Sequence, residues 1–235
     1  SFDIKAVGSC FRNLTLARCV DDELMQLVEE ITQENLVNFE RNHDFIVPVF
    51  WAFACQKHYK NLNLWNDFFS RVLLMKKKLS NEQFFDKLKN FSKTYLDILQ
   101  ILPFEASRIM PETVKELTWY CETNFQKRIL EFVDSRSVTG IHKEITYLIR
   151  EVVPDVKSEY VLEGHHFVDC FLPPKLVVEV DGPDHFIKYL DCAKPSKDFK
   201  VRLLEALGYE VKSISYQQWD LLETEQEKIT FLRNV

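Results

Sequence analysis

The run LVVEVDGPDHF at residues 176–186 decides how the last third of the chain folds. Its first five residues are apolar and mostly β-branched, with Glu179 as the exception, which is typical of a short central strand. Gly182 and Pro183 then mark a sharp turn, because these two residue types end regular structure. The run therefore predicts a buried strand that ends in a polar turn.

Other elements are predicted on both sides of this strand from apolar periodicity and from Ser, Pro and Gly at their ends. Strands are expected at residues 159–164, 166–172 and 210–215. Helices are expected at residues 140–151 and 196–207, and a short one from about Gln217. This order describes a small mixed sheet flanked by helices.

The preceding region is predicted to be helical from residue 6 to about 124. Asp21 and Ser80 stand where helix N-caps would stand, and apolar residues follow each at helical spacing. The chain has 19 Phe but only 5 Gly, which favours packed helices over a turn-rich β fold. A weak self-similarity at a shift of roughly 41 residues favours solenoid-like helix pairs, although an irregular helical bundle explains it equally well.

We therefore predict an α+β protein with two domains. Residues 1–134 form an α-helical, repeat-like region, and residues 135–235 form an α/β domain. The net charge is −6, and neither half of the chain is basic, which weighs against nucleic-acid binding by bulk electrostatics alone. A local basic groove remains compatible with this charge. No apolar run is long enough to span a membrane.

The six cysteines contain no C-x-x-C pair, so we expect reduced thiols and no cysteine-based zinc site. The densest basic stretch, Lys76-Lys77-Lys78, has two interpretations. It is either a ridge that contacts RNA phosphates or a solvated helix end.

Acidic side chains gather around the predicted central strand. Glu179 and Asp181 are two residues apart, so they point to the same face. If the two strands before and after the Pro173-Pro174 turn pair antiparallel, Asp169 lies near Glu179. Such carboxylates suit Mg²⁺ and phosphodiester cleavage. They also fit a hydrogen-bonded polar corner in which Asp181 caps the turn and Glu179 pairs with Lys200 or Arg202.

The run LVVEVDGPDHF, the later K-x-R-L-L-E-A-L-G-Y at 200–209 and Trp219 together resemble the RAP domain. With the preceding H-K-E-I at 142–145, the match covers roughly residues 140–235 and resembles the very-short-patch-repair-like branch of the PD-(D/E)XK nuclease superfamily. The helical region resembles heptatricopeptide-type repeats, and the FAST kinase family of organellar RNA proteins shares the C-terminal module. The resemblance implies a restriction-endonuclease-like fold and a role in RNA biology.

Site residues follow from the same resemblance. Glu144 corresponds to the helix acid, Asp169 to the strand acid and Glu179 to the first acid of the E-x-K pair, so Asp169 and Glu179 would bind Mg²⁺ if the protein is a nuclease. Asp181 stands where that pair has its lysine, which argues against catalysis and against any required cofactor. The predicted RNA-contacting residues are His185, Lys200, Arg202, Lys76, Lys77 and Lys78.

Three functions are therefore expected as alternatives. The first is a non-catalytic RNA-binding protein that acts on mitochondrial rRNA or mRNA in RNA processing, stability or ribosome assembly. The second is a metal-dependent endoribonuclease, whose catalytic residues would be Asp169, Glu179, Asp181 and Glu144. The third is a structural subunit of the mitochondrial ribosome, held by other ribosomal proteins. A plastid location is the second choice. The chain begins with Ser1 rather than Met, which is compatible with removal of an organellar transit peptide.

Overall fold

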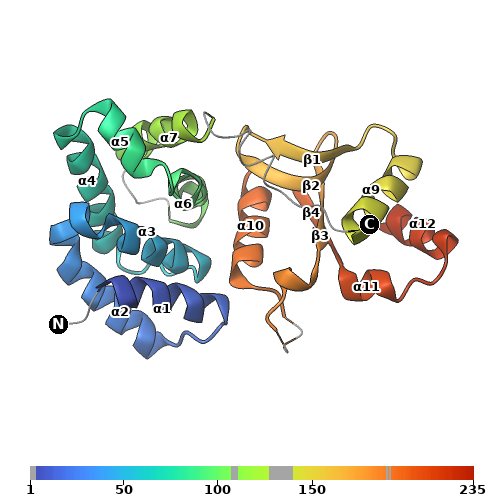
Figure 1. Ribbon diagram of the computed structural model, residues 1–235, viewed down its shortest axis with the longest axis horizontal. Coiled ribbons are helices and arrows are strands. Elements are labelled where there is room, and N and C mark those ends of the chain that lie inside the picture. The colour runs from blue at the N-terminus through green and yellow to red at the C-terminus, as the bar shows by residue number, and fades with distance from the viewer. Residues whose placement is uncertain (1–3, 107–110, 127–139, 189, 191) are drawn as a thin grey trace. The chain divides into compact units, whose positions relative to one another are not determined.

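The computed structural model describes residues 4–106, 111–126, 140–188, 190 and 192–235. The chain divides into two compact units, the first Ser1–Arg128 with Lys194–Phe199 and the second Ile129–Ala193 with Lys200–Val235. The predicted domain boundary between residues 134 and 135 lies outside the described residues. The predicted α+β class is confirmed, with helices in the first unit and a mixed sheet with helices in the second (Figure 1).

The described residues of the first unit form helices joined by short turns. Its helices are α1 (Ile4–Leu16), α2 (Asp22–Asn35), η1 (Leu36–Asn38), α3 (Phe39–Cys55), α4 (Leu62–Lys78), α5 (Asn81–Leu88), α6 (Ser92–Glu105) and α7 (Pro111–Gln126). Both predicted caps are present, because Asp21 accepts a hydrogen bond from the Leu24 N–H and Ser80 forms a capping box with Gln83. Helix α3 packs against both α1 and α6.

Aromatic side chains form the core of this unit. Phe50 stacks on Phe68 with ring centroids 3.8 Å apart, and Trp65 meets Phe50 edge-on at 4.9 Å. All three are buried. Rings of this size remove large apolar areas from water and pack best in stacked or edge-on pairs. The second half of α3, residues 46–55, is apolar on nearly all sides because it lies in this core.

The second unit holds a four-stranded sheet in the order β1-β2-β3-β4. Its elements are α9 (Gly140–Val152), β1 (Lys157–Leu162), β2 (His166–Leu172), β3 (Leu176–Asp181), η2 (Pro183–His185), α10 (Pro195–Ala206), β4 (Glu210–Ser215), α11 (Tyr216–Asp220) and α12 (Glu225–Asn234). Strands β1, β2 and β3 pair antiparallel, while β3 and β4 pair parallel. The helix α12 was not anticipated from the sequence.

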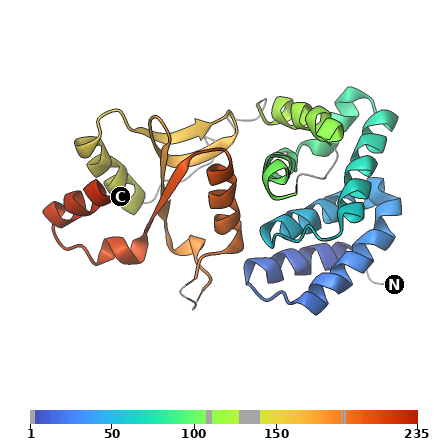
Figure 2. The same ribbon diagram turned by 180° about the vertical axis from the view of Figure 1, so that it is seen from behind.

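Helices cover both faces of this sheet. Helices α9 and α12 lie together on one side and α10 on the other, as the views from front and back agree (Figure 1 and Figure 2). Val178 and Val180 pack toward α9 with Ile145 and Trp219, whereas Val177 packs with Leu204 of α10. This alternation is what a strand buried on both faces requires. Within the described residues, no helix has the length and apolar character needed to cross a membrane.

Candidate functional site

A row of acidic residues crosses the first three strands of the sheet. Cys170 pairs with Val178 across β2 and β3, so Asp169 and Glu179 stand opposite each other one step further along. Ser158 and Tyr160 of β1 pair with the residues on either side of Asp169, which brings Glu159 opposite it on the other flank. The antiparallel pairing that was predicted to bring Asp169 near Glu179 is therefore present.

Asp169 is fixed in the gap between β2 and β3. It is buried, and its Oδ2 accepts a hydrogen bond of 2.7 Å from the backbone N–H of Val180. The Asp169 carboxylate thus accepts a hydrogen bond that a backbone carbonyl of the neighbouring strand would otherwise accept. This bond leaves Oδ1 directed toward helix α9, where it lies 3.9 Å from His142 Nε2.

Glu179 is a buried carboxylate with one cationic partner. Its Oε2 accepts a hydrogen bond of 2.5 Å from Lys200 Nζ on α10, and Oε1 has no hydrogen-bond partner among the described residues. Burial raises the pKa of Glu179 to about 7, and the charges of Asp169 and Asp181 add to this, while Lys200 opposes it. Glu179 therefore takes up a proton near neutral pH unless further positive charge reaches it.

Asp181 holds a histidine at the end of the same strand. Its side chain is fully buried, and its Oδ1 lies 2.8 Å from His185 Nδ1. The imidazole of His185 is 44% exposed, so the carboxylate orients a ring that reaches solvent. Asp181 and Glu179 share one face of β3, and each binds one side chain that can carry a positive charge.

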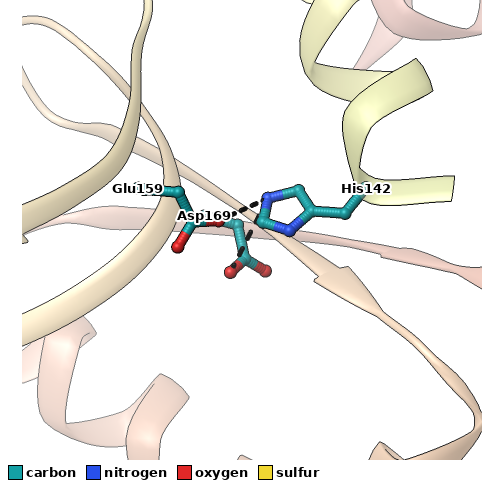
Figure 3. Close-up of side chains that lie close together, drawn as sticks. All are labelled: His142, Glu159 and Asp169. Carbon is teal, nitrogen blue, oxygen red and sulfur yellow. Dashed lines mark ion pairs between the residues drawn. The ribbon is translucent and has the colours of Figure 1, made fainter. Parts of the chain in front are cut away.

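A second cluster, not predicted from the sequence, joins α9 to the sheet. His142 Nε2 lies 3.1 Å from Glu159 Oε1, and one nitrogen or oxygen of each of His142, Glu159 and Asp169 lies within 4.8 Å of the others (Figure 3). Glu159 has a left-handed backbone with φ of 48°, which is uncommon for a residue other than Gly. One signal for the position of Glu159 was present in the sequence. Glu159 precedes Asp169 by 10 residues, which is the same spacing as that between Asp169 and Glu179 on the next pair of strands.

Glu144, the predicted helix acid, is not brought to the acidic row. Its two oxygens bind Trp219 Nε1 at 3.0 Å and Lys228 Nζ at 2.7 Å. Both partners belong to the segment that includes α11 and α12. Residues two apart on a helix point in different directions, so His142 faces Asp169 while Glu144 does not. Trp219 is a buried core residue.

The remaining predicted RNA contacts differ in their surroundings. Arg202 is half-buried on α10, two residues after Lys200. Lys76, Lys77 and Lys78 end helix α4, where lysines suit the negative end of the helix dipole. Lys78 binds Glu40 at 2.5 Å, and Lys76 lies over the Tyr120 ring. Two of these three lysines are therefore engaged within the helical unit.

Comparison with known proteins bears on the second unit. Residues 178–235 match the family described as RAP domain. Over 102 residues the chain is 29% identical to a protein of Oryza sativa subsp. japonica named RAP domain-containing protein, chloroplastic. The aligned stretch is 43% of this chain but only 16% of the rice protein, so the chain spans a small part of that relative. The matched residues begin on β3 and include Glu179, Asp181, His185 and Lys200.

Proposed function

The chain contains a RAP domain, and from this premise we propose that the protein binds RNA inside an organelle without cleaving it. The RNA contact would form at the end of β3, where His185 and Lys200 emerge. The proposal rests chiefly on one feature of this place: two buried carboxylates hold two solvent-reaching basic side chains. The net charge of −6 over the whole chain is compatible with such a local contact.

Anchored basic groups are suited to phosphate. A free lysine loses side-chain entropy when it binds, but Lys200 is already held by Glu179, and His185 is already held by Asp181. Their exposed fractions, 36% and 44%, leave both within reach of a ligand. Arg202 lies on the same helix as Lys200 and would extend the contact. Phosphate contacts of this kind give affinity that depends strongly on salt.

A lack of catalysis is favoured by Asp181. In the E-x-K arrangement an ammonium group stands two residues after the first acid, but here that position holds a buried carboxylate bonded to His185. A second negative charge beside Glu179 would oppose the attack of hydroxide on a phosphodiester rather than assist it. The acidic row would then serve to position the groups that contact RNA.

The test is filter binding of single-stranded RNA to the intact chain at several salt concentrations. We expect the double variant His185→Ala, Lys200→Ala to bind about tenfold more weakly, with a salt slope shallower by about 1 to 2. Lys212→Ala is the matched control, because Lys212 pairs with Val178 in the sheet register and its Nζ lies 3.4 Å from Glu210 Oε1. Equal RNA affinity in the double variant and the control would contradict the proposed contact.

The organelle and the assembly are finer parts of the proposal. The rice relative is named chloroplastic, which supports an organellar protein and keeps a plastid open beside the mitochondrion. A role in RNA processing, stability or ribosome assembly, or as a subunit of the mitochondrial ribosome, would follow from which RNA is bound. Sequencing the RNA that co-purifies from fractionated organelles tests this. Absence from ribosomal fractions would remove the ribosomal role while leaving RNA binding intact.

A metal-dependent endoribonuclease is the second candidate, and Glu179 favours it. Its buried Oε1 has no hydrogen-bond partner among the described residues, and a bound cation would satisfy this atom. Asp169 and Glu179 would hold Mg²⁺, which supplies polarisation of the phosphate and a more acidic bound water. Lys200 would provide, from α10, the ammonium group that position 181 lacks.

Cleavage of RNA with and without Mg²⁺ separates the two candidates. The nuclease predicts activity that is lost in both Asp169→Asn and Glu179→Gln but kept in Glu210→Gln, whose side chain is largely exposed on β4. Binding without cleavage in the parent protein supports the first candidate. Cleavage that persists in both site variants would point to a contaminating nuclease.

A further inference from the structure

The cluster of His142, Glu159 and Asp169 has the composition of a metal site. One residue comes from helix α9, one from β1 and one from β2, so the fold rather than the local sequence brings them together (Figure 3). His142 and Asp169 are buried, while the side chain of Glu159 is 29% exposed. The cluster therefore has a buried base and one side from which an ion could enter. We propose that these three residues bind one divalent transition-metal ion.

The distances fit this assignment. Two ligand atoms bound to one ion at roughly 2.0–2.2 Å are roughly 3 to 3.5 Å apart when they occupy neighbouring coordination positions. His142 Nε2 is 3.1 Å from Glu159 Oε1 and 3.9 Å from Asp169 Oδ1. All three ligand atoms lie within 4.8 Å of one another, so an ion placed among them would require small side-chain rotations. Asp169 is already oriented by its bond to the Val180 N–H, which acts on Oδ2 and leaves Oδ1 toward the cluster.

The charge around the cluster independently calls for a cation. Asp169, Glu179 and Asp181 are all buried: Asp169 accepts from the Val180 N–H, Asp181 holds His185, and Glu179 binds Lys200 through Oε2 alone. Buried carboxylates are costly unless positive charge or hydrogen bonds compensate them. Glu179 Oε1, more than nine-tenths buried and without a hydrogen-bond partner among the described residues, stands opposite Asp169. A divalent ion at Asp169 would lower the cost of the whole row.

The donor set indicates which ion. An imidazole nitrogen with two carboxylate oxygens suits Zn²⁺ or Mn²⁺, whereas Mg²⁺ and Ca²⁺ prefer oxygen ligands alone. The site differs from the Mg²⁺ pair of the nuclease candidate, since it uses His142 and Glu159 and shares only Asp169. It does not depend on RNA binding, so it is tested on the RNA-free protein.

Mn²⁺ is the first probe because the chain has exposed thiols, Cys10 and Cys19, that would bind Zn²⁺ on their own. Titration of the intact, chelator-treated protein is followed by the electron paramagnetic resonance signal of free Mn²⁺. We expect one bound Mn²⁺ per chain, displaced by Zn²⁺ at lower concentration than by Mg²⁺. The first-row affinity order places Zn²⁺ above Mn²⁺ at such a site.

Two variants and one control decide the assignment. His142→Ala and the near-isosteric Glu159→Gln should each weaken Mn²⁺ binding by more than the roughly 10- to 100-fold typical of losing an outer-shell partner. Glu144→Gln lies on the same helix but bonds Trp219 and Lys228, so its Mn²⁺ affinity should equal that of the parent. Circular dichroism confirms that each variant folds. No bound Mn²⁺ in the parent, or equal binding in Glu159→Gln and Glu144→Gln, would overturn the proposal.

Discussion

The two units bury polar groups of different kinds. In the helical unit Thr32 and Ser92 donate to the carbonyls four residues earlier, while Asn124 donates to the more distant carbonyl of Phe85. In the sheet unit the buried polar residues include three carboxylates, Asp169, Glu179 and Asp181. Local bonds within a helix cost the fold little, whereas buried carboxylates reduce its stability unless they are compensated.

This difference separates a scaffold from a site. The aromatic core of the helical unit is explained by stability alone, because its rings fill space and carry no charge that loses hydration on burial. The acidic row is not explained by stability, since apolar residues at the same positions would pack on both faces of β3 without charge. Buried carboxylates kept at such a cost are the place where we propose that a ligand acts.

The largest effect that tests this contrast is expected in the aromatic core. Phe68→Ala should lower the free energy of unfolding by roughly 3–5 kcal/mol, because it removes a ring in contact with Phe50 and Tyr95 and leaves a cavity. Hydrogen exchange with mass spectrometry reads this loss in the helical unit. Phe104→Ala, at a side chain 58% exposed, is the control and should change the stability little. Similar losses in both variants would mean that the ring cluster is not the stabilising core.

Much of the sheet could be predicted because its signals are local. The apolar run of β3, the turn residues after it and the capping Ser80 each act within a few residues, and each predicted element was found. The approach of Asp169 to Glu179 followed from a short turn between two strands, which fixes an antiparallel register. Helix α12 was missed because its apolar face is small and its packing partner, α9, is distant in sequence.

The composition of the site depended on distant contacts and was only partly predictable. Glu144 was expected at the acids, but Trp219 and Lys228, 75 and 84 residues away, bind its carboxylate instead. His142 was missed because only the packing of α9 on the sheet decides which of two neighbouring helix positions faces Asp169. Glu159 was missed because its left-handed backbone is not indicated by the residues around it.

A smaller change, an increase in the free energy of unfolding, is expected from removing the buried charge of Glu179. Glu179 has a pKa of about 7 in the fold against 4.5 in a free side chain. Its contribution to stability is therefore fully present below pH 4.5 and is lost as the pH rises through 7, by about 3 kcal/mol. The lost pair with half-exposed Lys200 offsets part of this. Glu179→Gln should then be about 2 kcal/mol more stable than the parent at pH 8, in the presence of a chelator.

Urea unfolding at pH 5 and pH 8, read by exchange in the sheet unit, measures this difference. Little difference between parent and variant is expected at pH 5, where Glu179 carries its proton in the fold. Glu210→Gln on β4 serves as control, because its exposed carboxylate should give the same result at both pH values. A variant less stable than the parent at pH 8 would show that the charged pair with Lys200 stabilises the sheet, and the contrast between the units would weaken.

The smallest expected effect is the pH dependence of the stability of the helical unit. This stability should decrease in acid, whereas that of the sheet unit should increase. Burial lowers the pKa of His43, and the hydrogen bond with Asp44 opposes this. The stability that neutral His43 contributes is present above pH 6.5 and is lost as the pH falls through its lowered pKa. Exchange protection of α3 should therefore decrease in acid while protection of β3 increases. His43→Gln removes the titrating ring, so its α3 protection should no longer change over this range relative to other helices. If acid decreased the exchange protection of β3 and left that of α3 unchanged, the opposite effects assigned to Glu179 and His43 would be wrong.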